Sequence, residues 1–379
     1  MPPAIDRILE YPLKERLFQG RVVVLYGPRR AGKTTLVKKV VASFPDKKTL
    51  WLNGDNPPDA ARLAGKGVDD YRALAEGYDF VVVDEAQRVP EIGTVLKLFA
   101  DHVPGTQVIA TGSSSFELAG KVNEPLTGRK FALTLLPLSL RELGADLGKF
   151  AAQKRLPFWL VHGTYPEISQ LGEAAAQERL AELAESYLYR DLFSLDKIRK
   201  PETLKGLVRL LALQIGQEVS FPELASALKT NVATVLSYVG LLEQAFVVFQ
   251  APGFSRNLRK EIAKSRKVYF YDVGIRNAVL GRFQVPELRD DVGHLWENFV
   301  AGERMKSGFY ENLRRPEIHF WRTYDQQEID LVETSGDGIT AWECKWNPAA
   351  KWRAPKAFRE AYPQANARLA TPGNLWEWA

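Results

Sequence analysis

Near the start of the chain, two glycines, a lysine and a threonine have the spacing of a phosphate-binding loop. Four residues separate Gly27 from Gly32, and Lys33 and Thr34 follow directly. In this pattern backbone N–H groups turn toward a phosphate, the lysine reaches the outer phosphates and the threonine hydroxyl binds Mg²⁺. An apolar run before the loop predicts a strand, and apolar spacing after it predicts a helix. The residues predicted to contact a nucleotide here are Gly27, Pro28, Arg29, Arg30, Ala31, Gly32, Lys33, Thr34 and Thr35.

A second predicted strand ends in two acids. Residues 80–83 are apolar, and Asp84 and Glu85 follow them. We expect Asp84 to hold Mg²⁺ together with Thr34, and Glu85 to act as general base toward the attacking water. Small-molecule kinases do not need the second acid, whereas ATP-hydrolysing motors usually carry one. The pair therefore predicts catalysis by Lys33, Asp84 and Glu85, with ATP and Mg²⁺ as cofactors.

Three further polar residues are candidates for contact with the outer phosphate. Thr111 and Ser113 follow the next apolar run, where a polar sensor of the phosphate could lie. A plain turn explains each of them equally well. Arg129 could neutralise charge on the phosphate of a neighbouring subunit, which would require a homo-oligomer. A structural surface arginine is the open alternative.

The C-terminal part of the sequence carries a second set of acids. Glu297 falls in a predicted helix, Asp330 in a predicted strand, and Glu343 and Lys345 on one face of the next strand. Two or three carboxylates can gather Mg²⁺, with Asp330 and Glu343 as the predicted ligands, and Lys345 can orient the nucleophile. The same residues could instead form a solvated hairpin face with an ion pair. We expect Cys344 to pack in the core.

Between these two regions, helix and turn signals predict a winged helix-turn-helix. Helices are expected over 223–228 and 232–242, with Thr234, Ser237 and Tyr238 facing outward, and a strand over 246–249. A basic stretch follows and is suited to contacts with DNA phosphates. Its basic residues are Arg256, Arg259, Lys260, Lys264, Arg266 and Lys267. An intramolecular lid or a protein-docking unit is the alternative role.

The predicted elements give an α/β fold in four parts. Residues 1–20 suggest an amphipathic helix, and strands are expected at 22–26, 49–53, 80–84, 107–111 and 131–135. Continuous apolar strands alternating with helices are typical of a parallel sheet. The predicted domains are an ATPase core (1–136), a helical lid (137–198), a winged helix (199–285) and an α/β domain (286–379).

Composition narrows the setting of the protein. The 379-residue chain has a net charge of +5, which permits a DNA partner without requiring one. The single cysteine rules out a disulfide framework and a zinc site built from cysteines within the chain. The four histidines are scattered, which disfavours a metal site built from histidines. The first residues lack an apolar signal core, and no apolar run is long enough to span a membrane. We therefore expect a cytoplasmic protein without a membrane partner.

Taken together, these motifs resemble one family of AAA+-type P-loop ATPases from bacteria and archaea. The resemblance rests on the loop at 27–35, the acids at 84–85, residues 111–114 and 127–129, and Leu-Pro-Leu-Ser at 136–139. Members of that family carry a fused C-terminal domain of long-unassigned function. The stretch 162–167 resembles the family's Gly-Gly-x-Pro motif with one glycine displaced. The acids from Glu297 to Lys345 resemble the PD-(D/E)xK core of restriction-endonuclease-like domains, which implies phosphodiester hydrolysis or DNA binding.

Two interpretations of function stay open from the sequence. The first is an ATP-hydrolysing motor that acts on branched or end-containing DNA through its nuclease-like domain. The second is a slowly hydrolysing regulatory switch that recruits a protein partner and has an inactive nuclease-like domain. The basic stretch and the complete set of acids favour the motor, whereas the modest net charge favours the switch.

Overall fold

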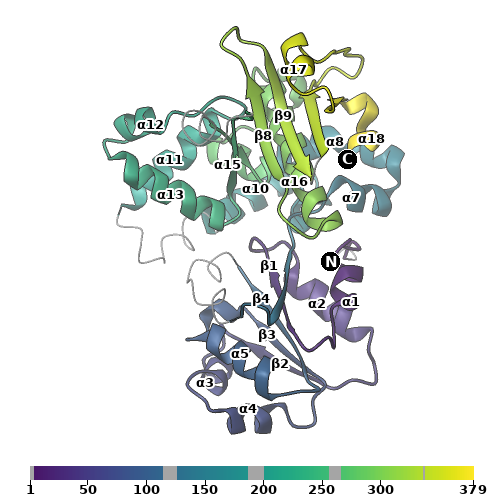
Figure 1. The fold of residues 1–379 in the computed structure, drawn as a ribbon, viewed down its shortest axis with the longest axis vertical. Coiled ribbons are helices and arrows are strands. Elements are labelled where there is room, and N and C mark those ends of the chain that lie inside the picture. Colours follow the sequence, from purple (N-terminus) through teal and green to yellow (C-terminus); the bar gives the residue numbers. More distant parts are fainter. Residues whose placement is uncertain (1–3, 114–125, 187–199, 256–265, 336–337) are drawn as a thin grey trace. The chain divides into compact units, whose positions relative to one another are not determined.

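The computed structural model describes residues 4–113, 126–186, 200–255, 266–335 and 338–379. The chain divides into two compact units, Met1–Pro137 and Leu138–Ala379, shown in Figure 1. Predicted residues Arg256, Arg259, Lys260 and Lys264 lie outside the described ranges. The finer division into four domains remains a prediction.

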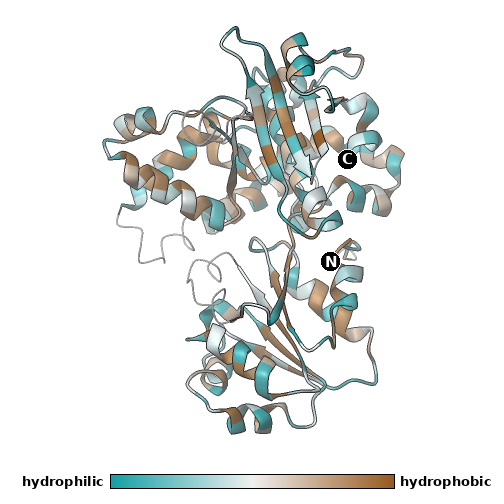
Figure 2. Ribbon diagram, in the orientation of Figure 1, coloured by the Kyte–Doolittle hydropathy of each residue, from teal (hydrophilic) through white to brown (hydrophobic). Residues whose placement is uncertain are grey.

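The first unit contains a five-stranded parallel sheet in the order β2-β3-β4-β1-β5. Its strands lie where continuous apolar runs predict them, and β1, β3 and β4 are buried along their whole length. Figure 2 shows these strands as largely hydrophobic ribbons. The strands are β1 (Val22–Tyr26), β2 (Thr49–Asn53), β3 (Phe80–Asp84), β4 (Gln107–Gly112) and β5 (Lys130–Thr134).

Helices lie before and between these parallel strands along the chain. They are α1 (Glu10–Glu15), α2 (Lys33–Ala42), α3 (Pro57–Leu63), α4 (Val68–Ala75) and α5 (Ile92–His102), with a short 3₁₀ turn η1 (Ala86–Arg88). The predicted leading helix over 1–20 is wrong in length, because only α1 forms in the described part. The chain leaves helical geometry before its predicted end, since Phe18 has a left-handed φ of 59°.

The second unit begins with helices and a two-stranded sheet. Its first elements are α7 (Leu140–Leu147), α8 (Lys149–His162), α9 (Pro166–Ser169), α10 (Glu173–Ala184), α11 (Pro201–Leu213), α12 (Phe221–Ala227), α13 (Val232–Gln244), β6 (Val248–Pro252), β7 (Arg266–Phe270) and α15 (Val273–Leu280). Ser139 and Ser220 cap α7 and α12 as predicted. The outward placement of Tyr238 is wrong, because its side chain is buried and its hydroxyl accepts the Lys200 N–H.

The C-terminal half of the second unit has the element order helix, three strands, helix, strand. A short 3₁₀ turn, η3 (Pro286–Leu288), precedes this half. The elements are α16 (Val292–Glu311), β8 (Glu317–Arg322), β9 (Glu328–Ser335), β10 (Gly338–Cys344), α17 (Lys356–Ala361) and β11 (Asn366–Ala370), followed by η4 (Pro372–Asn374) and α18 (Leu375–Trp378). The sheet order is β11-β10-β9-β8; β8, β9 and β10 are antiparallel neighbours, and β10 and β11 are parallel. A buried cluster including Trp321, Ile329 and Phe358 forms its core.

One loop joins two helices of the second unit through a carboxylate. Asp272 caps α15 by accepting the N–H groups of Gly274 and Ile275, and it also accepts the N–H of Thr164 at 2.8 Å. The backbone approach is close, because a Cβ on Gly163 would lie 2.0 Å from Asp272 Oδ1. The stretch 162–167 therefore serves here to attach α8 to α15.

Across the part of the chain that the structure describes, every helix is too short or too polar to cross a membrane.

Candidate functional site

The phosphate-binding loop lies at the carboxyl end of β1 and leads into α2. Gly27 has a φ of 147°, and a Cβ there would lie 1.9 Å from the Leu135 carbonyl oxygen. Gly32 takes the left-handed N-cap position of α2 at a φ of 94°. Both positions therefore need glycine for backbone reasons. The helix N-terminus behind the loop favours an anion in front of it.

Lys33 is held inside this loop. Its Nζ donates to the carbonyl oxygens of Gly27 and Pro28, each at 2.9 Å, and the residue is buried. Burial lowers the pKa of Lys33 to about 8, against the opposing charges of Glu85 and Asp84. The ammonium thus lies among backbone oxygens that a phosphate could replace as its partner.

Asp84 gathers two hydroxyl groups from neighbouring elements. Thr34 at the start of α2 donates to Asp84 Oδ2 at 2.9 Å, and Thr111 at the end of β4 donates to Oδ1. The sheet order explains this meeting, because β4 lies between β1 and β3 and parallel strands end at one edge. A carboxylate and a hydroxyl are the hard oxygen donors that Mg²⁺ prefers, so the residues fit this ion.

Glu85 follows Asp84 in a left-handed conformation with a φ of 49°. Its carboxylate accepts the Gln87 side-chain N–H at 2.5 Å, and the same Gln87 nitrogen donates to Ser113 Oγ at 3.0 Å. The Glu85 N–H donates to Thr111 Oγ1 at 3.3 Å. The structure thus brings together Lys33, Thr34, Asp84, Glu85, Thr111 and Ser113, and it adds Gln87, which the sequence analysis missed.

Arg129 lies away from this group. It precedes β5, and its carbonyl accepts the N–H of Val22 at the start of β1. Its guanidinium pairs with Asp101 at 2.6 Å. Since the phosphate-binding loop follows the other end of β1, Arg129 cannot serve the loop of its own chain from this position.

The second unit contains an acid cluster, formed by Glu297 on α16, Glu328 and Asp330 on β9, and Glu343 on β10. Lys267 lies within it: its Nζ is 2.9 Å from Glu297 Oε1 and 2.6 Å from Glu328 Oε1. Tyr269 donates its hydroxyl to the same Glu297 oxygen at 2.6 Å. Burial favours the neutral form of Lys267 and so lowers its pKa. The charges of Glu297, Glu328 and Asp330 outweigh this effect and raise the pKa above the ordinary value.

This geometry corrects one predicted DNA contact. Lys267 is buried and paired with carboxylates, so it is not a surface contact for DNA phosphates. Lys267 lies on β7 and faces Glu297 of α16 and Glu328 of β9. Its neighbour Arg266 is half-buried and donates to the Gln250 side-chain oxygen at 2.9 Å.

The remaining predicted residues of the acid cluster lie on neighbouring strands. Asp330 Oδ2 accepts the Cys344 N–H at 2.8 Å, and Glu343 Oε1 pairs with Lys345 Nζ at 2.7 Å. Burial, followed by the charges of Glu297 and Glu343, raises the pKa of Asp330 to about 8. Burial also raises the pKa of Glu343. Cys344 is buried, as predicted.

The predicted metal site in the acid cluster does not fit this arrangement. Within the described ranges, no three His, Cys, Asp or Glu side chains are grouped so that they could hold a metal ion. Lys267 and Tyr269 already use Glu297 Oε1, and Asp330 keeps its proton near neutral pH because of its raised pKa. We therefore derive no metal-dependent step at Asp330 and Glu343.

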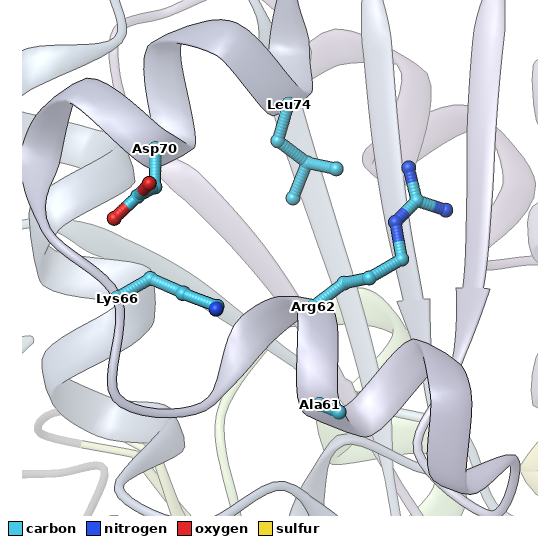
Figure 3. Close-up of a pocket in the computed structure, with 5 residues that line it drawn as sticks. All are labelled: Ala61, Arg62, Lys66, Asp70 and Leu74. Atoms are coloured by element: carbon cyan, nitrogen blue, oxygen red, sulfur yellow. The ribbon is translucent and has the colours of Figure 1, made fainter.

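A separate hollow of about 350 Å³ lies between α3 and α4. Ala61, Arg62, Lys66, Asp70 and Leu74 line it (Figure 3). It shares no residue with either group described above.

Comparison with known proteins agrees with the nucleotide site. Residues 19–144 match a family model described as an AAA domain. Residues 153–285 and 292–374 match two domains of unknown function, DUF8612 and DUF4143. The uncharacterized protein Rv2008c of Mycobacterium tuberculosis is 33% identical over 330 residues, covering 86% of this chain and 70% of that protein. The chain belongs to the Rv2008c family.

The Rv2008c family match extends to more distant proteins. The uncharacterized protein MJ1544 of Methanocaldococcus jannaschii is 24% identical and covers 94% of this chain and 82% of its own length. Among solved structures, AMPPCP-bound DnaA from Aquifex aeolicus aligns with 62% of this chain and 86% of its own at 15% identity and a TM-score of 0.32. The AAA match and the loop geometry identify the first unit of this Rv2008c-family chain as an AAA-type ATPase domain.

Proposed function

We propose that this chain hydrolyses ATP and uses the hydrolysis cycle to act on DNA. ATP hydrolysis is supported by the group of residues at the edge of the parallel sheet, where Asp84 accepts hydrogen bonds from Thr34 and Thr111. Glu85 lies beside it at the end of β3. Hydrolysis needs one acid that binds the metal ion and a second acid that can act on the attacking water.

Each residue of the group has a separate task in this proposal. Lys33 exchanges its two loop carbonyls for phosphate oxygens when ATP enters. Thr34 and Asp84 would hold Mg²⁺, which would neutralise charge on the phosphates. Glu85 orients a water and takes its proton on a carboxylate oxygen. Gln87 holds Glu85 and Ser113 together, so it positions the base.

The second half of the proposal rests on the second unit. Its C-terminal order of helix, three strands, helix and strand, with Asp330 on the second strand and Glu343 and Lys345 at the third, supports a restriction-endonuclease-like domain. Helices α12 and α13 with the β6–β7 hairpin support a winged helix. We propose that these modules bind DNA, chiefly through its phosphates. Arg129 remains a proposal for a residue that acts on a neighbouring subunit.

The regulatory switch is the second candidate function. The observation that favours it is the pairing of Lys267 with Glu297 and Glu328, because it neutralises acids that a nuclease would use. In that case the second unit binds a protein partner and hydrolysis is slow.

ATP hydrolysis by the purified protein separates the two candidates. Rates are measured without DNA and with single-stranded DNA, duplex and a four-way junction, with Lys33→Ala as the blank. The DNA-acting proposal predicts stimulation by at least one DNA form. Hydrolysis that is indifferent to every DNA would favour the switch. Intact DNA after incubation with Mg²⁺ or Mn²⁺, under conditions where binding is shown, would exclude cleavage.

A further inference from the structure

The strand β7 inserts a buried cation into the acid cluster of another module. Lys267 has a side chain only 2% exposed, and Glu297 opposite it is 6% exposed. A buried charge without partners is costly, so a lysine is tolerated at this depth only with paired carboxylates. Lys267 lies in the stretch that matches DUF8612, and Glu297 and Glu328 lie in the stretch that matches DUF4143. The pair therefore connects two modules by charge.

A second side chain from β7 reinforces this connection. Tyr269 lies two residues beyond Lys267, and alternate residues of a strand share a face. Both side chains reach Glu297 Oε1, at 2.6 Å from the tyrosine hydroxyl and 2.9 Å from the ammonium. The other carboxylate oxygen of Glu297 faces His294 Nδ1 at 3.9 Å. Glu297 is therefore surrounded by groups that favour its charged form.

The other side of the acid cluster contains an acceptor without a donor. Glu343 Oε1 pairs with Lys345, but Glu343 Oε2 is buried and has no hydrogen-bond partner among the residues that the structure describes. Asp330, on the neighbouring strand, also lacks a cation of its own in the described contacts. Among the described residues, Lys267 is thus the one deeply buried cation beside these acids, and it contacts Glu297 and Glu328.

We propose that Lys267 is the resident cation of the acid cluster, so that the winged-helix module closes the cluster to divalent metal ions. An ammonium and a metal ion repel one another at short range, and the repulsion is strong where water is scarce. Removing the lysine charge leaves Glu297 and Glu328 without their shared cation, beside Asp330 and Glu343. One divalent cation then takes the place of the ammonium between Glu297 and Glu328. The inference concerns the second unit alone and does not depend on ATP hydrolysis.

Binding of Mn²⁺ to the nucleotide-free full chain tests this inference. The number of bound ions is counted by electron paramagnetic resonance for the wild type, Lys267→Met and Arg266→Met. We expect Lys267→Met to bind one Mn²⁺ more than the wild type, at least about tenfold more tightly than any ion the wild type takes up at the acid cluster. Arg266→Met is the matched control, because it removes the neighbouring charge outside the cluster, and it should bind as the wild type does.

Two further variants keep the test decisive if Lys267→Met folds poorly. Lys267→Gln removes the charge but keeps an amide N–H that can donate to Glu297 or Glu328, so the buried carboxylates keep a hydrogen-bond donor. It should gain the same extra ion and lose it again when Glu328→Gln is added. The inference is overturned if a folded Lys267→Met or Lys267→Gln protein binds no extra Mn²⁺. It is also overturned if the wild type binds an ion that Glu328→Gln removes, since the cluster would then accept metal with Lys267 in place.

Discussion

At the scale of single residues, Asp330 makes the stability of the second unit depend on pH. Its pKa is raised to about 8 by burial, followed by Glu297 and Glu343, whereas an unfolded aspartate titrates near 3.8. The folded state therefore holds an extra proton between these pH values. Stability is highest below the unfolded pKa and falls as the pH rises through the window toward 8. The side chain remains partly exposed, which limits the size of the effect.

Asp330→Asn should remove this pH dependence. The amide oxygen can still accept the Cys344 N–H, but the side chain no longer titrates. We expect the Tm of the wild type to fall between pH 5 and about pH 8.5, by roughly 2–4 °C for each kcal/mol of unfolding free energy lost. The Tm of the variant should fall much less. Thermal unfolding followed by circular dichroism measures both values. Asp325→Asn, on an exposed turn, is the control, and equal slopes for both variants would contradict the assignment.

At the scale of elements, Asp272 connects α8 to α15 through three backbone donors. It accepts the N–H groups of Thr164, Gly274 and Ile275, at 2.8, 2.9 and 3.3 Å, and it is buried. Asp272→Ala leaves these donors without an acceptor, at about 1–3 kcal/mol for a buried unsatisfied group. We expect the free energy of unfolding, measured with urea, to fall by at least about 2 kcal/mol.

Two matched variants show whether this loss comes from the buried donors. Asp272→Asn should lose less, because its amide oxygen still caps α15 while its NH₂ group faces the Thr164 donor. Asp290→Ala removes an acid whose side chain is 80% exposed and should change little. Equal losses for Asp272→Ala and Asp290→Ala would show that the donors find other acceptors.

Much of the first unit could be predicted from the sequence, because its signals are local. The strands β1, β2 and β3 have the predicted bounds, since each is a short hydrophobic stretch bordered by polar or glycine residues. The sequence also places the acids of the second unit on the correct elements. It does not predict their partner Lys267, because in the sequence this residue is the end of a basic run. Its pairing with Glu297, thirty positions away, depends on how β7 packs against α16. Local patterns do not encode such packing.

At the scale of the whole molecule, ATP should stabilise the first unit and leave the second unchanged. A ligand that binds only the folded state adds about 2.7 kcal/mol at a hundredfold excess over its Kd. In calorimetry, a non-hydrolysable ATP analogue with Mg²⁺ should raise the midpoint temperature of one unfolding transition. Lys33→Ala should abolish this rise. Asp272→Ala should lower the other transition without reducing the rise. If the analogue raised the midpoint temperatures of both transitions equally, this would contradict independent unfolding of the two units.

The most direct test of the account compares nucleotide binding with turnover in Glu85→Gln. The substitution keeps the size of the side chain and removes the base, while Lys33, Thr34 and Asp84 stay in place. We predict that ATP binds the variant as tightly as the wild type, and that kcat falls by about 10²–10⁴-fold. Lys33→Ala should lose binding as well. Glu85→Gln hydrolysing ATP at the wild-type rate would contradict the assignment of Glu85 as general base and, with it, the proposed hydrolytic site.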